Sequence, residues 1–127
     1  MFSPKLIEEI HKEIIRSTGG SFGIRDENLL ESSLKVPFQT FGKEDLYKTP
    51  IEKAAKLLET IIKNYPFVDG NKRVAYVLFR LFLEENGYVL TATEEEKYNL
   101  IMSIASHKIS YKQIIEWTRK HSSKVQS

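Results

Sequence analysis

The stretch Asn64-Tyr65-Pro66-Phe67-Val68-Asp69-Gly70-Asn71-Lys72-Arg73-Val74-Ala75 decides how the rest of this 127-residue chain is arranged. Apolar residues recur at three- and four-residue spacing before it, from Ile51 to Ile62, and again after it, from Val74 to Phe82. Both flanks therefore predict buried helices. The segment between them is a loop that leads into the second helix, and it carries one carboxylate, one amide and two cations.

These loop residues predict a site for a phosphate and a metal. The first turn of a helix leaves backbone N–H groups without partners and carries partial positive charge. Gly70 lets a ligand approach the main chain closely, Lys72 supplies a point charge, and Arg73 offers a planar fork that suits phosphate. Asn71 can donate to a phosphate oxygen or hold the loop. Asp69 would repel a bare phosphate but could hold Mg²⁺, which takes one or two carboxylates, waters and substrate phosphates.

A plainer interpretation of the same residues stays open at this point. Asp69 or Asn71 could cap the helix, as these residue types commonly do, beside a solvated Lys-Arg pair.

The run Pro66 to Arg73 resembles the signature of the Fic/Doc (Fido) superfamily, His-x-Phe-x-Asp/Glu-Gly/Ala-Asn-Gly/Lys-Arg. Lys72 stands where AMP-transferring Fic enzymes carry a second glycine, so the match is closer to the Doc (death-on-curing) toxin branch. Similar residues at Gly23-Ile24-Arg25-Asp26, Leu29-Leu30-Glu31-Ser32, Pro37 and Phe41-Gly42 extend the resemblance over roughly residues 3–120. We therefore expect the all-α Fido fold, a compact bundle of about six helices with an anion-binding loop at the N-terminus of a central helix.

The resemblance implies transfer of the γ-phosphoryl group of ATP to a protein hydroxyl, which in Doc toxins is a threonine of elongation factor Tu. Asp69 would hold Mg²⁺, and Gly70, Asn71, Lys72 and Arg73 would stabilise the charge of the phosphates. ATP and Mg²⁺ are thus the expected cofactors. Two alternatives remain, namely AMP transfer of the Fic type and a non-catalytic module that binds nucleotide or an antitoxin.

Tyr65 departs from the family pattern at the position of the histidine that serves as general base. A histidine can take a proton near neutral pH, whereas a tyrosine stays protonated and only donates. Because a matched general base contributes about 10²–10⁴ in rate, Tyr65 should weaken or abolish transfer while leaving the phosphate loop intact. The chain could be a disarmed toxin or a natural variant, and the sequence leaves both open.

A partner is implied because the inhibitory Ser/Thr-x-x-x-Glu-Gly/Asn motif of self-restrained Fic proteins is not found. Glu27-Asn28 is preceded at four residues by Gly23, and Glu85-Asn86 by Leu81. By resemblance, we expect restraint by a Phd-like antitoxin.

Composition predicts one domain over residues 1–127, with a polar tail from about residue 121 to 127 that frays. Apolar residues make up 41% and charged residues 28% of the chain, and the net charge is +2, which does not argue for direct nucleic-acid binding. Neither a cysteine nor an apolar run of membrane-spanning length is present in the sequence, so we expect a cytoplasmic protein without membrane contact.

The remaining segments predict helix starts and one irregular connection. Ser3, Asp26, Thr49, Thr93 and Ser110 read as helix N-caps. Residues 36–50 are bounded by prolines and predict an ordered loop. The resemblance assigns docking of the target to it, and the alternative is a connection that its aromatic residues pin to the core. We expect His11 to be packed in the first helix, Arg25 to be a surface charge or an interior anchor, and the three histidines not to form a metal site.

Overall fold

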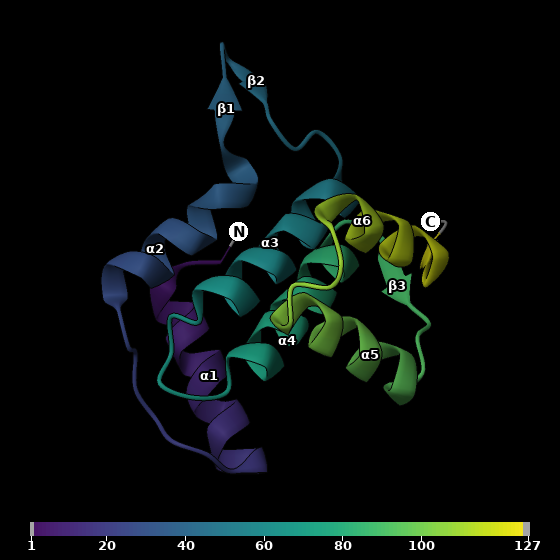
Figure 1. Cartoon of the computed structure of the whole chain (residues 1–127). Coiled ribbons are helices and arrows are strands. Elements are labelled where there is room, and N and C mark those ends of the chain that lie inside the picture. Colours follow the sequence, from purple (N-terminus) through teal and green to yellow (C-terminus); the bar gives the residue numbers. More distant parts are fainter. Residues whose placement is uncertain (1, 126–127) are drawn as a thin grey trace.

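The computed structural model describes residues 2–125 and confirms the all-α class, with six α-helices in that range (Figure 1). In chain order the elements are α1 (Pro4–Thr18), α2 (Glu27–Lys35), the 3₁₀ turn η1 (Val36–Phe38), β1 (Thr40–Phe41), β2 (Glu44–Asp45), α3 (Pro50–Asn64), α4 (Asn71–Glu85), β3 (Tyr88–Leu90), α5 (Glu94–Ala105), α6 (Tyr111–Lys120) and β4 (Ser122–Lys124). No helix within residues 2–125 is long and apolar enough to cross a membrane.

Helices α3 and α4 form the centre of the molecule. They lie side by side, joined by the motif loop of residues 65–70, and α3 also packs against α2, α5 and α6 (Figure 1). Of the residues from Ala54 to Ile62, all but Lys56 are buried. The buried Glu59 carboxylate is paired with Lys56 at 2.9 Å and Lys63 at 3.3 Å, which offsets the cost of removing its charge from water.

The predicted N-caps are confirmed at five helices. The side chains of Ser3, Asp26 and Thr49 accept from amides three residues on, at 2.9–3.1 Å. Thr93 and Ser110 each form a complete capping box. These interactions span three residues, and they satisfy amides that the helices themselves leave without partners.

Residues 36–50 are ordered, as predicted, and contain an antiparallel hairpin. Strands β1 and β2 pair Thr40 with Asp45 and Phe41 with Glu44 across a Gly42-Lys43 turn, in which both residues have positive φ, 57° and 72°. The hairpin projects from the body of the protein near the first turn of α3 (Figure 1).

The prediction of a frayed tail is wrong for residues 121–125, whereas residues 126 and 127 lie outside the described part. Strand β4 pairs with β3, with Tyr88 opposite Lys124. His121 is buried, and its ring nitrogens lie 2.8 Å from the Trp117 carbonyl oxygen and 2.8 Å from Glu96 Oε2. The Thr93 amide and the His121 ring, both bonded to the Glu96 carboxylate, lower the pKa of Glu96 to about 2.

Candidate functional site

The side chain of Asn71 closes the motif loop on itself. Its Oδ1 accepts from the Phe67 amide at 2.9 Å, and its Nδ2 donates to the Phe67 carbonyl at 3.0 Å. Of the two roles predicted for Asn71, the structure therefore shows the one of holding the loop. Phe67 itself is buried, so the loop is fixed both by hydrogen bonds and by packing.

The start of α4 has no side-chain cap among the described residues, so the capping interpretation is wrong. Gly70 is the N-cap residue, at φ 76°, and Asp69 Oδ1 accepts from the Gly70 amide rather than from the first turn of the helix. The backbone amides of Asn71, Lys72 and Arg73 consequently stay available to an anion.

Asp69 is held ionised at the edge of the loop. Its Oδ2 accepts from the Ser21 amide at 3.1 Å and its Oδ1 from the Gly70 amide at 2.8 Å. These two hydrogen bonds, aided by the guanidinium of Arg73, lower the pKa of the Asp69 carboxyl from its ordinary value. Gly20 lies so close that a Cβ atom there would stand 2.6 Å from Asp69 Oδ2, which explains a glycine at this position.

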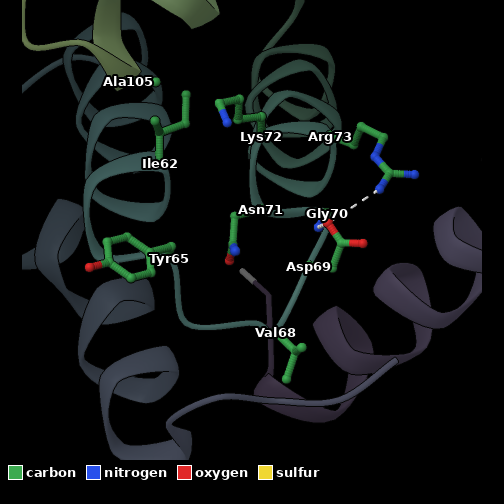
Figure 2. A pocket seen from close by; sticks show the side chains of 9 residues that line it. All are labelled: Ile62, Tyr65, Val68, Asp69, Gly70, Asn71, Lys72, Arg73 and Ala105. Atoms are coloured by element: carbon green, nitrogen blue, oxygen red, sulfur yellow. Dashed lines mark hydrogen bonds and ion pairs between the residues drawn. The ribbon is translucent and has the colours of Figure 1, made fainter. Parts of the chain in front are cut away.

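Lys72 and Arg73, both predicted to bind phosphate, point in different directions (Figure 2). The Arg73 guanidinium donates to Thr18 Oγ1 and, at 2.7 Å, to the Gly19 carbonyl at the end of α1, and it lies 3.8 Å from Asp69 Oδ1. The Lys72 side chain extends toward Ile62 and Ala105 instead. In this conformation Arg73 joins α1 to the loop, whereas Lys72 is not paired with any of the residues that the structure describes and can meet a ligand.

Tyr65 ends α3 in the left-handed conformation, at φ 35°, and is 55% exposed. Arg25 fixes this turn: its Nε donates to the Tyr65 carbonyl and its Nη2 to the Asn64 carbonyl, each at 2.8 Å, and its guanidinium lies 4.5 Å from the centre of the Tyr65 ring. Arg25 is therefore an anchor of the motif loop rather than a plain surface charge. The Tyr65 hydroxyl points away from Asn71 and Gly70 (Figure 2).

Two segments distant in sequence support the loop. Residues 23–26 run along it, with the Arg25 amide bonded to the Pro66 carbonyl at 2.7 Å and the Val68 amide to the Gly23 carbonyl at 3.0 Å. His11 of α1 is buried, as predicted, and its Nε2 donates to the Asp69 carbonyl at 2.7 Å. The sequence does not predict these three contacts, since they join residues more than 40 positions apart.

The loop lines a cavity of about 450 Å³ that gathers six of the predicted site residues, Tyr65, Asp69, Gly70, Asn71, Lys72 and Arg73, with Ile62, Val68 and Ala105 (Figure 2). Asp69 is the one carboxylate in this lining. Within residues 2–125 no cluster of three or more side chains could hold a metal ion by itself. A metal bound here would thus take most of its ligands from water and from a bound phosphate.

The hairpin of residues 40–45 lies at the opposite end of α3 from this cavity (Figure 1). A helix of 15 residues separates them, a length of about 22 Å. Residues 20–25, not the hairpin, are the segment that lies against the motif loop. The hairpin would therefore reach only those parts of a docked target that lie well away from the cavity.

Together, fold and site define an all-α domain whose two central helices are joined by a loop that leaves the start of α4 without a side-chain cap. Residues 1–83 match the model of the Fic/DOC family, and the chain belongs to that family. A relative named Toxin Doc, from Mycolicibacterium smegmatis, is 39% identical over 74 residues, which is 58% of this chain and 57% of the relative. The chain thus matches somewhat more than half the length of that toxin.

Proposed function

We propose that this chain is a Doc-type toxin that binds ATP and Mg²⁺ at the motif loop, in a form whose phosphoryl transfer is weakened or silenced by Tyr65. The proposal rests on one observation: an uncapped helix start, the Lys72 ammonium and an ionised Asp69 all lie around the same cavity. Membership of the Fic/DOC family and the similarity to Toxin Doc support it.

The proposed reaction joins a protein hydroxyl to the γ-phosphorus. The bond between that phosphorus and the β–γ bridging oxygen breaks, ADP leaves, and the hydroxyl proton passes to the residue at position 65. The free amides of α4 and Lys72 would hold the phosphates, and Arg73 could join them by leaving its contacts with α1. A phenol is a far weaker acceptor of a proton than the imidazole that the family motif carries at this position, so the proposed transfer is slow.

The residues present fit a magnesium site with a single carboxylate. Each oxygen of Asp69 accepts one backbone N–H and keeps a lone pair, and the carboxylate is partly exposed to the cavity. Asp69 would hold the ion together with waters and nucleotide phosphates, and the ion would neutralise phosphate charge.

The test compares this chain with Tyr65→His in a bacterial extract containing Mg²⁺ and ATP labelled at the α- or the γ-phosphate. We expect the histidine form to pass γ-label to one abundant protein, about 10²-fold or more faster than the tyrosine form. The variant Tyr65→Phe is the matched control, because it keeps the ring and should be as slow as Tyr65. α-Label in the product would identify a Fic-type AMP transferase instead.

A non-catalytic binding module is the second candidate, and the orientation of Tyr65 favours it. Its ring is held over Arg25 with the hydroxyl turned from the loop, so Tyr65 is not placed to activate an acceptor there. Binding of ATP by both forms with no transfer of either label would support this candidate.

The partners we propose rest on the similarity to Toxin Doc. They are a Phd-like antitoxin that restrains the chain and a protein target in the cytoplasm, with the threonine of elongation factor Tu as the first to examine. Identification of the labelled protein by mass spectrometry would test the target. Co-expression with a candidate Phd-like antitoxin would test that partner.

A further inference from the structure

His11 lies directly beneath the motif loop, in a position that the proposed chemistry does not explain. It is 1% exposed, and its ring stacks on that of Phe67 with centroids 4.0 Å apart and an interplanar angle of 5°. Its Nε2 lies 2.7 Å from the carbonyl oxygen of Asp69. Only a nitrogen that carries a proton can donate to a carbonyl, so Nε2 carries a proton.

The bonded carbonyl belongs to the peptide group that joins Asp69 to Gly70. In a trans peptide the carbonyl and the N–H point in opposite directions. Here the carbonyl faces His11, and the N–H of Gly70 faces the other way, where it donates to Asp69 Oδ1 at 2.8 Å. One peptide group thus connects the buried histidine to the carboxylate of the site.

This peptide group could also face the opposite way. Gly70 has φ 76°, and glycine populates positive and negative φ about equally, so φ of Gly70 does not by itself prevent a rotation of the 69–70 peptide by half a turn. The rotated peptide would turn a carbonyl oxygen, with its partial negative charge, toward Asp69 Oδ1 at the edge of the cavity. It would also remove the N–H bond that holds Asp69 Oδ1 in place.

We propose that His11 is a positioning residue, whose Nε2–H bond to the Asp69 carbonyl keeps the Asp69–Gly70 peptide in the orientation that leaves the loop open to an anion. This inference rests on the proposed function, in which the loop binds nucleotide phosphates. The stacked Phe67 ring holds the imidazole in the required place. Histidine suits this position because it is flat enough to stack and carries a donor at its far end.

The variants His11→Phe and His11→Gln separate the hydrogen bond from the packing. Phenylalanine keeps a ring against Phe67 but has no donor, whereas the amide of glutamine can donate to the carbonyl. With ADP as the probe and Mg²⁺ present, we expect His11→Phe to weaken binding about tenfold or more, and His11→Gln to stay within about threefold of the unmodified chain. Thermal unfolding of each variant checks that the fold is kept.

An NMR measurement reports the orientation of the Asp69–Gly70 peptide directly. Rotation of the peptide changes ψ of Asp69, so the cross-relaxation between Asp69 Hα and the Gly70 amide proton should change in His11→Phe and not in His11→Gln. The ring nitrogen shifts of the unmodified chain show which nitrogen carries the proton, and a proton on Nδ1 alone would overturn the inference even if His11→Phe fails to fold.

The outcomes separate this inference from the proposed function. If the unmodified chain binds no ADP, the proposed function fails, while the NMR comparison still decides what His11 does. If His11→Phe binds ADP as the unmodified chain does and its Asp69–Gly70 peptide is unchanged, His11 is only a packed core residue and the inference is wrong.

Discussion

Helix α3 carries a very different structure at each end. Its C-terminal end leads into the motif loop, whose six residues are fixed by Asn71, by Arg25 and by His11 from three parts of the chain. Its N-terminal end follows the β1–β2 hairpin, whose strands have two residues each and whose tip residue Phe41 is 81% exposed. The conformation of the loop is set by distant contacts, and that of the hairpin by its own turn.

This difference teaches where a rigid conformation is needed. A site that meets charged phosphates gains affinity when its donors are already in place, since no ordering is required on binding. A projecting hairpin carries no such requirement. Matched substitutions at the two ends should therefore differ in their effects on stability and on ADP binding.

The largest effect is expected for Phe67→Ala. Phe67 is 1% exposed and stacked on His11, so its removal leaves a cavity under the motif loop. We expect the free energy of unfolding to fall by about 3–5 kcal/mol, as measured by urea denaturation. A loss below about 1 kcal/mol would mean that the loop is not part of the core.

A smaller loss is expected for Asn71→Ala, because two backbone groups of Phe67 lose their partners at once. Each buried group left unpaired costs about 1–3 kcal/mol, and we expect a total of about 2–3 kcal/mol together with weaker ADP binding. The control is Asn71→Asp, which keeps the acceptor for the Phe67 amide and should lose less stability than alanine. Equal losses for both variants would show that the donor to the Phe67 carbonyl provides the whole effect.

A third comparison uses one glycine from the motif loop, Gly70, and one from the hairpin turn, Gly42. Gly70 and Gly42 both have positive φ, 76° and 57°, so alanine is strained by about 1 kcal/mol at either position. A Cβ atom at Gly70 would also stand 3.0 Å from Ile15 Cδ1, whereas at Gly42 it would meet nothing within 4 Å. We expect Gly70→Ala to lose about 1–2 kcal/mol and to weaken ADP binding, and Gly42→Ala to lose about 1 kcal/mol with ADP binding unchanged. Equal effects on ADP binding would contradict the separation of the two ends.

The sequence predicts the parts of this fold that depend on neighbouring residues. The caps at Ser3, Asp26 and Thr49 join residues three apart, and the apolar spacing of α3 and α4 is likewise local. The same spacing places Gly70 and Lys72 at the start of a buried helix, which is why the candidate site could be located from the sequence.

The sequence does not predict contacts that join distant segments. Arg73 bonds to Thr18 and Gly19, more than 50 residues earlier, and nothing in its local pattern distinguishes this role from phosphate binding. The pairing of β4 with β3 also joins distant segments. In addition, strands of three residues show too little alternation to be recognised from the sequence.

The smallest effect is expected for Phe41→Ser at the tip of the hairpin. Because the side chain is 81% exposed, its removal should change the free energy of unfolding by no more than about 0.5 kcal/mol and leave ADP binding unchanged. Transfer to the protein target is the sharper measurement, made in the Tyr65→His form. If transfer slows while ADP binding holds, the hairpin contacts the target about 20 Å or more from the cavity, and docking and chemistry occupy opposite ends of α3. Unchanged transfer would instead mean that the target docks on segments beside the motif loop, and residues 20–25 would be the first of these to test.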